Sequence, residues 1–170
     1  RREIGVISHS TALYADLTSM ENLIFFGKMY GLERPDESAL AVLEDVGLAP
    51  RRHDRVRTFS RGMVQRLSIA RAILHDPSIL FLDEPFTGLD IHASNVLKEH
   101  LQNLHNKKRT ILMTTHDVSC GLEMCDKVAL QVMGRFVFFK DIKEVNKENF
   151  ETMYFDAVRN NQFTMGIRQH

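Results

Sequence analysis

The sequence predicts an α/β fold built around a largely parallel sheet. The continuous apolar run Ile79–Leu82 has the composition of a strand buried on both faces, and Thr110–Thr114 predicts a second buried strand. Segments with helical patterns alternate with these strands, which is typical of a parallel sheet covered by helices. With 170 residues, the chain is long enough for one domain with a substantial core.

The N-terminal part of the chain is expected to contain a short strand and a capped helix. Ile4–Ile7 predicts the strand. Thr18-Ser19-Met20-Glu21 has the pattern of a capping box, in which Thr18 accepts from the backbone and Glu21 reaches back to Thr18. The helix that begins there is expected to continue to about Tyr30 and to end at Gly31.

A second helix, an irregular stretch and a third helix follow. The second helix is predicted at Asp36–Val46 and ends at Gly47. Pro50–Thr58 is rich in arginine and is predicted to be irregular. Ser60 stands at the N-cap position of the third helix. One face of this helix carries the apolar residues Met63, Leu67, Ala70 and Leu74, at helical spacing.

The C-terminal half continues the same alternation. Its predicted elements are a helix at Ala93–Leu104, the strand Thr110–Thr114, a helix at Val118–Met124, a hairpin of Val128–Val132 and Phe136–Phe139 that turns at Met133-Gly134, and an amphipathic tail helix with Phe150, Met153, Tyr154, Ala157 and Val158 on its apolar face.

Composition excludes several classes of function. Twenty-two basic and 22 acidic residues give zero formal charge, so the chain lacks the basic surplus of a nucleic-acid-binding protein. No apolar run approaches the length of about 20 residues that a membrane-spanning helix needs. The two cysteines, Cys120 and Cys125, do not make a disulfide framework, which favours a reducing, cytoplasmic setting.

Two carboxylates follow one predicted strand, and a histidine follows another. Asp83 and Glu84 end the first strand, and His116 comes just after the second. Parallel strands would bring all three to the sheet edge where ligands gather. Asp83 is suited to bind magnesium through a water molecule, and Glu84 is suited to orient or deprotonate an attacking water. His116 could bind a phosphate or that water. Taken alone, Asp83-Glu84-Pro85 is equally consistent with a turn; the apolar run before it and Gly88-Leu89-Asp90 after it favour the site.

Ser60 and Gly62 form a second candidate site. A hydroxyl and exposed N–H groups at the start of a helix attract an anion, and the helix dipole adds to this attraction. Ser-x-Gly alone is more often an ordinary helix cap. The spacing between Ser60 and Asp83 favours a phosphate contact.

These motifs together resemble those of ATP-binding cassette (ABC) ATPases. Phe59-Ser60-Arg61-Gly62-Met63, followed by Gln65-Arg66, is similar to the signature motif LSGGQ with its following Gln-Arg; Ile79–Asp83 with Glu84 resembles the Walker B strand and catalytic glutamate; Gly88-Leu89-Asp90 resembles the D-loop; Thr114-Thr115-His116 resembles the switch histidine; and Leu13 to Leu23 resembles the segment after the Q-loop. The resemblance covers nearly the whole chain.

The resemblance implies a P-loop NTPase-like fold with an inserted helical subdomain. Its parts would be the Q-loop and helical subdomain at about 10–58, the motif-bearing core at 59–140 and a helical tail at 141–170. Two such subunits, identical or different, would pair head to tail around two ATP molecules with Mg²⁺. The predicted nucleotide-binding residues are Ser60, Gly62, Met63 and Asp90; the predicted catalytic residues are Glu84, His116 and His9; and Asp83 is the predicted metal ligand, acting through water.

The same resemblance implies a transport function. Membrane permease subunits would dock near the helical subdomain, on the cytoplasmic face of the inner or plasma membrane, and no nucleic acid would be a partner. The expected docking surface is Ser10–Tyr30, with Leu13, Tyr14, Phe25 and Phe26 as candidates. Ordinary packing of the helical lobe explains the two phenylalanines equally well.

Three departures from the family pattern affect this interpretation. His9 stands where the Q-loop glutamine is usual, and Arg61 and Met63 replace a glycine and the glutamine of the signature. This version of the motifs resembles exporter-type members, including haem exporters and ABC-2-type exporters. The Gly-rich Walker A loop GxxGxGK[ST] is not among these residues, so we expect a piece of a longer protein without the N-terminal strands.

Three alternatives compete with this interpretation. The chain could be a truncated, catalytically incomplete module that does not bind ATP tightly, or a non-transport ABC ATPase that acts on DNA or the ribosome. The DNA-repair branch of the latter is disfavoured because no coiled coil separates His9 from Ser60, whereas a translation-type member would carry two cassettes in its full-length chain. A zinc site at His116, Cys120 and Cys125 is also disfavoured, because its cysteines are not closely paired and a fourth ligand is lacking.

Overall fold

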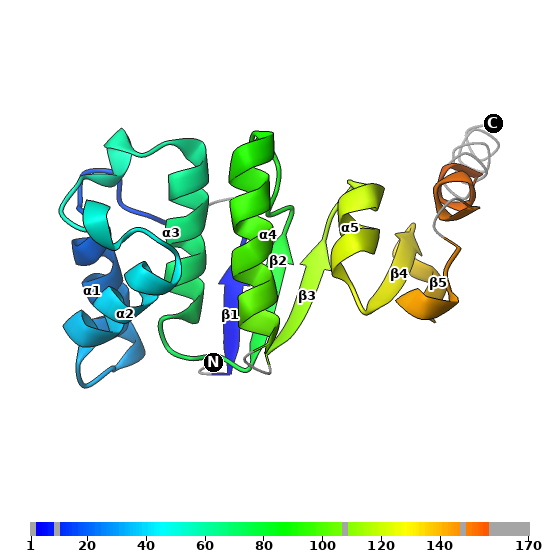
Figure 1. The fold of residues 1–170 in the computed structure, drawn as a ribbon. Coiled ribbons are helices and arrows are strands. Elements are labelled where there is room, and N and C mark those ends of the chain that lie inside the picture. The colour runs from blue at the N-terminus through cyan, green and yellow to red at the C-terminus, as the bar shows by residue number, and fades with distance from the viewer. Residues whose placement is uncertain (1–2, 9–10, 107–108, 147–148, 157–170) are drawn as a thin grey trace, which may run out of the picture. The chain divides into compact units, whose positions relative to one another are not determined.

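The computed structural model describes residues 3–8, 11–106, 109–146 and 149–156. The chain forms two compact units, Arg1–Thr115 and His116–His170 (Figure 1). Among the described residues, no helix combines the length and the apolar character that crossing a membrane requires.

The described residues of the first unit form a three-stranded sheet and four α-helices, with two short 3₁₀ helices. Its elements in chain order are β1 (Ile4–Ile7), α1 (Ser19–Tyr30), α2 (Pro35–Asp45), 3₁₀ helices at Ala49–Arg51 and Val56–Thr58, α3 (Arg61–Ile73), β2 (Ile79–Asp83), α4 (Ile91–Asn106) and β3 (Thr110–Thr114). The second unit contains α5 (Val118–Met124), β4 (Lys127–Val132), β5 (Arg135–Asp141), a 3₁₀ helix at Ile142–Glu144 and a helix at 149–156.

The predicted parallel sheet is confirmed. The strand order is β1-β2-β3, and both pairings are parallel. The register places Ile7 beside Leu82 and Asp83 beside Thr114. The carboxyl ends of β2 and β3 therefore meet at one edge, where Asp83 stands.

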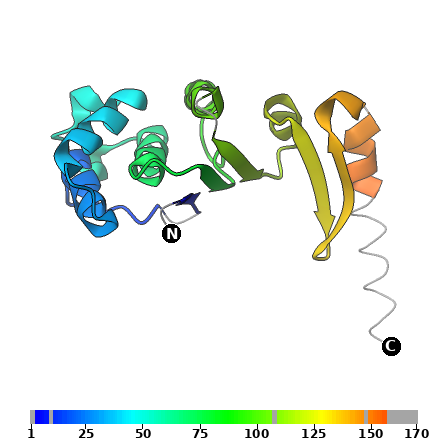
Figure 2. The same ribbon diagram turned by 90° about the horizontal axis from the view of Figure 1, so that it is seen from below.

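The predictions that Ile79–Leu82 is buried on both faces and that Thr110–Thr114 is a buried strand are wrong for the described residues. Leu80 and Leu82 are buried, but their neighbours on the other face are not: Val6 is 51% exposed, Phe81 37% and Leu112 57%. The reason is that α3 and α4 lie on the same side of the sheet (Figure 2). Side chains alternate between the two faces of a strand, so only every second residue lies under a helix.

The helix α1 has the predicted capping box. The Glu21 N–H donates to Thr18 Oγ1 at 3.1 Å, and the Thr18 N–H donates to Glu21 Oε2 at 2.7 Å. The Thr18 hydroxyl also donates to Glu21 Oε2, at 2.9 Å. The two hydrogen bonds that the Glu21 carboxylate accepts, first the one from the Thr18 backbone, lower the pKa of Glu21. The buried Asn22 side chain binds both the N–H and the C=O of Tyr14, at 2.8 and 3.0 Å. This amide fixes the segment before α1 against the helix.

The prediction that Pro50–Thr58 is irregular is also wrong. Two 3₁₀ helices occupy most of this stretch, and they are bound to the start of α1. The Ser19 hydroxyl donates to the carbonyls of Arg51 and Arg52, and the Val56 N–H donates to the Leu17 carbonyl. Tertiary hydrogen bonds order this segment, and the sequence pattern carries no sign of them.

The predicted hairpin is confirmed in the second unit, where β4 pairs with β5. Met133 and Gly134 both have positive φ, 52° and 76°, as a two-residue turn of type I′ requires. Phe138 of β5 packs edge-on against Phe150, with ring centroids 5.4 Å apart, and Phe150 is buried. The tail helix is therefore confirmed over 149–156; its predicted residues Ala157 and Val158 lie outside the described part of the chain.

Candidate functional site

Asp83 is the last residue of β2, at the carboxyl edge of the sheet. Its side chain is exposed, and its Oδ1 accepts a hydrogen bond of 2.7 Å from Thr114 Oγ1 of the neighbouring strand. The described residues hold no group of three or more His, Cys, Asp or Glu side chains able to enclose a metal ion. One exposed carboxylate at such an edge fits Mg²⁺, which keeps most of its own water.

Glu84 turns the chain sharply out of the strand. Its φ is +48°, in the left-handed region that non-glycine residues seldom adopt, and such strain is concentrated at functional sites. Its N–H donates to the Thr114 carbonyl at 3.0 Å. Its carboxylate accepts a hydrogen bond of 3.4 Å from Thr87 Oγ1, and the Thr87 N–H donates to the Glu84 carbonyl at 3.2 Å. Neighbouring groups thus hold the carboxylate at the strand end.

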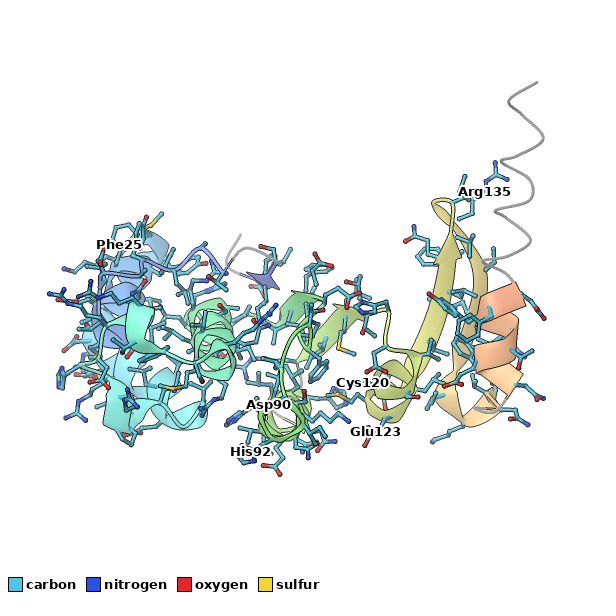
Figure 3. All side chains as sticks on the ribbon, turned by 90° about the horizontal axis from the view of Figure 1, so that it is seen from above. Phe25, Asp90, His92, Cys120, Glu123 and Arg135 are labelled. Atoms are coloured by element: carbon cyan, nitrogen blue, oxygen red, sulfur yellow. The ribbon has the colours of Figure 1, made fainter. Side chains whose placement is uncertain are left out.

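Asp90 caps the helix that follows. Its Oδ1 accepts from the Ala93 N–H at 2.7 Å, and α4 begins at Ile91, two residues before the predicted start. Figure 3 shows Asp90 and His92 at this end of α4. The side chain of Asp90 therefore has a structural task besides its predicted contact with a nucleotide.

Ser60 caps α3, as predicted. Its Oγ accepts from the Met63 N–H at 3.3 Å. At Gly62 the helix approaches α4 closely, because a Cβ atom added there would lie 2.9 Å from the Cβ of Ala93. The N-terminal ends of α3 and α4 are thus packed together.

The structure brings the predicted nucleotide-binding residues together. A cavity of about 130 Å³ between the starts of α3 and α4 is lined by Ser60, Gly62, Met63, Arg66, Asp90, His92, Ala93 and Val96. All four residues predicted from the signature and the D-loop are in this set. Its volume is below the range of roughly 300–1,000 Å³ that whole small-molecule ligands occupy. The cavity can hold part of a nucleotide only.

For the other two predicted catalytic residues, the predicted place at the site is not tested. His9 lies outside the described residues. His116 belongs to the second unit, where its side chain is exposed. Its predicted convergence with Asp83 and Glu84 stays a prediction.

Sequence reasoning missed two arginines at this site. Arg66 lines the cavity, and its Nη1 donates to the Val46 carbonyl at 3.0 Å, just beyond the end of α2. Burial lowers the pKa of Arg66. Arg61 lies against Gly88, in the loop after Glu84. The pair Gln65-Arg66 that follows the signature motif was a signal for Arg66, whereas nothing in the sequence pairs Arg61 with Gly88.

Three of the candidate docking residues, Tyr14, Phe25 and Phe26, form one aromatic cluster. Tyr14 contacts Phe25 edge-on, with centroids 5.2 Å apart, and Phe25 contacts Phe26 in the same way at 5.3 Å. Tyr14 is 50% exposed and Phe25 40%, whereas Phe26 and Leu13 are half-buried. Phe25 lies at the outer side of the first unit (Figure 3). Of the two phenylalanines, Phe25 is more available to a partner, and Phe26 contributes more to packing.

Comparison with known proteins shows the family of this chain. The sequence model of the ABC transporter family matches residues 1–87. The ABC transporter ATP-binding protein NatA of Bacillus subtilis (strain 168) is 39% identical over 143 residues, which cover 81% of this chain and 57% of that protein. The Linearmycin resistance ATP-binding protein LnrL of the same organism is 37% identical over 139 residues, or 81% of this chain and 45% of that protein.

A third relative is a Fluoroquinolones export ATP-binding protein of Mycobacterium tuberculosis (strain CDC 1551 / Oshkosh). It is 42% identical over 134 residues, which cover 79% of this chain and 44% of that protein. The chain thus spans about half the length of the curated relatives it matches. Because the family model covers more than half of the chain and includes Ser60, Gly62, Asp83 and Glu84, the chain belongs to the ABC transporter family.

Proposed function

We propose that the complete protein is the ATP-binding subunit of an ABC exporter. It would hydrolyse ATP in a head-to-tail dimer, of identical or different subunits, and drive export through membrane permease subunits. Support for export comes from the names of the relatives, which include a fluoroquinolones export and a linearmycin resistance ATP-binding protein. The subunit would lie on the cytoplasmic face of the inner or plasma membrane.

One observation carries the dimer part of this proposal. The cavity that holds Ser60, Gly62, Met63 and Asp90 measures about 130 Å³, too little for a whole ATP molecule. The carboxylates Asp83 and Glu84 do not line it. The cavity and the two carboxylates are thus two separate half-sites. A chain needs two such half-sites when each ATP is shared between two copies.

Each half-site would have a different role. Ser60, Gly62, Met63 and Asp90 would contact the nucleotide bound to the partner, through a hydroxyl and N–H groups at a helix start. In the chain's own site, Asp83 would hold hydrated Mg²⁺, which neutralises phosphate charge when bound. Glu84 would orient or deprotonate the attacking water.

The remaining assignments follow the family motifs. His116 and His9 would assist at the chain's own nucleotide. The helical subdomain at about 10–58 would carry the docking surface for the permease, the core at 59–140 would carry the motifs, and 141–170 would form the tail. The exposed rings of Tyr14 and Phe25 support docking at the helical subdomain.

Replacing Glu84 tests the catalytic assignment. In the complete protein, Glu84→Gln should leave ATP binding intact and reduce turnover by at least roughly a hundredfold, as expected for loss of a general base. The ATP-bound dimer should then persist and be visible by gel filtration. The matched control is Glu123→Gln, at an exposed carboxylate of α5. Normal turnover by Glu84→Gln would remove Glu84 from its assigned role.

A further inference from the structure

The segment between α2 and α3 carries an uneven share of the charge of the chain. Residues 51–57 contain four arginines, Arg51, Arg52, Arg55 and Arg57, and one carboxylate, Asp54, which is a formal charge of +3 (4 − 1) in a chain of zero net charge. All four arginines are exposed. These four residues are called the arginine patch below.

Backbone hydrogen bonds, not the arginine side chains, hold this segment beside the start of α1. The Met20 N–H donates to the Arg52 carbonyl at 3.1 Å. The Arg57 N–H donates to the Ala15 carbonyl at 2.9 Å. The buried Ser19 hydroxyl lies 3.2 Å from each of two carbonyls of the segment. The guanidinium groups are therefore presented at the surface by a backbone that is ordered through other contacts.

The carboxylates near the arginine patch do not bind it strongly. Arg57 Nη1 lies 3.7 Å from Asp16 Oδ1, and the two side chains are 57% and 85% exposed. Arg51 pairs with Asp54, three residues further along the chain, also in contact with solvent. Ion pairs in such positions are screened by water and contribute little to stability. The arginines can therefore exchange these partners for another anion.

An aromatic surface adjoins the arginine patch. Ala15, which accepts from the Arg57 N–H, directly follows Tyr14 in the chain. Tyr14 is exposed and contacts the exposed ring of Phe25 edge-on. Exposed rings beside basic side chains are typical of protein surfaces that lie on a bilayer, because the rings suit the headgroup level and the basic groups attract lipid phosphates.

We infer that the arginine patch lies against the anionic phospholipid headgroups of the membrane that holds the permease. The inference rests on the proposed function, which places the subunit at a membrane face. A guanidinium forms paired hydrogen bonds with phosphate oxygens. Several basic side chains together are also attracted by the negative surface potential of an anionic leaflet.

A bilayer fits this surface better than an acidic protein segment does. None of the four arginines lines the cavity at the starts of α3 and α4, or the cavity of about 350 Å³ near the ends of the same helices. Headgroups can move sideways to meet separate, exposed arginines, whereas a bound peptide usually needs a groove for its side chains. A single basic patch gives only reversible attachment, so the permease would supply the second point of attachment.

Vesicle binding by the complete protein, without the permease, tests the inference. The probe is a vesicle of equal parts phosphatidylglycerol and phosphatidylcholine, and the comparison is a vesicle of phosphatidylcholine alone. In co-sedimentation, the parent protein should bind the first and not the second. Its binding should be lost between about 0.1 M and about 1 M salt, because the screening length falls from about 10 Å to about 3 Å.

Two double variants locate the contact. Arg52→Gln with Arg55→Gln should lower the partition coefficient for the anionic vesicles at least roughly tenfold, as expected for two basic side chains at such a surface. The matched control, Lys28→Gln with Arg34→Gln, removes two exposed charges at the other end of α1 and just before α2, and should bind like the parent. Both variants should melt and dimerise with ATP like the parent, because all four side chains are exposed. The salt dependence of the parent decides the question if the patch variant proves unstable.

The outcomes separate this inference from the proposed function. A parent protein that binds both kinds of vesicle equally, or neither, overturns the inference, and so does a patch variant that binds like the control. If the patch variant binds vesicles normally but no longer co-purifies with the permease, the arginines serve an acidic protein segment; the inference is then overturned and the proposed function stands. Failure of the proposed function would instead appear in the lipid-free assays of Glu84→Gln.

Discussion

Replacing Ser60 with aspartate or alanine separates its task in the helix from its task at the nucleotide. The side chain accepts from the Met63 N–H at 3.3 Å and caps α3. Aspartate caps a helix as well as serine does, whereas alanine cannot cap. Because Ser60 is exposed, neither replacement creates a packing defect.

The two substitutions should have opposite profiles. Ser60→Ala should lower the free energy of unfolding by about 1 kcal/mol, through loss of the cap, and the melting temperature by roughly 2 to 4 °C for a domain of about 150–250 residues. Ser60→Asp should keep this stability. Its charge would face a phosphate charge at about 4 Å, a repulsion of about 4 kcal/mol at an effective dielectric constant of about 20. Since about 1.4 kcal/mol changes an equilibrium tenfold, ATP-driven dimerisation should weaken roughly a thousandfold.

Thermal melting measures the first effect, and gel filtration with ATP and Mg²⁺ in the Glu84→Gln background measures the second. A Ser60→Asp protein that melts like the parent and dimerises at the same ATP concentration would refute the placement of Ser60 at a triphosphate. Mixed dimers extend the test: one Ser60→Arg subunit with one wild-type subunit should retain at most one working site.

Two further predictions concern stability and partner binding. Burial lowers the pKa of His75, whose Nε2 lies 3.0 Å from the Ile4 carbonyl, so the folded state favours the neutral ring. The stabilisation of the fold by the neutral His75 ring should be complete above about pH 6.5, the ordinary histidine pKa, and should be lost as the pH falls. The difference in unfolding free energy between the parent and His75→Gln should therefore shrink from pH 8 to pH 5. Phe25→Asp should weaken co-purification with the permease but leave ATP-driven dimerisation unchanged. The control Leu40→Asp, also at an exposed apolar residue, should affect neither. Equal co-purification of both variants would contradict docking at Phe25.

Local elements could be predicted from the sequence because their causes lie within a few residues. Thr18 and Glu21 make their hydrogen bonds across a single turn, so the capping box indicates where α1 begins. The turn at Met133 and Gly134 is similarly determined by neighbouring residues. The order of strands and helices followed from the same local patterns.

Contacts between distant segments could not be predicted in this way. Pro50–Thr58 has no helical pattern of its own, and hydrogen bonds to Ser19 and Leu17 order it. The exposure of Phe81 depends on which side of the sheet α3 and α4 occupy, and the apolar run alone is compatible with helices on both sides.

By itself, the sequence determined the family, the parallel sheet and the carboxylates at the end of β2, because these depend on motif spacing and strand period. Only the tertiary structure decided that Ser60, Gly62, Met63 and Asp90 line one cavity and that Arg61 rests on Gly88. Both results depend on how closely the starts of α3 and α4 approach each other. That distance is set where Gly62 meets Ala93, 31 positions apart in the chain (93 − 62), and packing of side chains, not local preference, determines it.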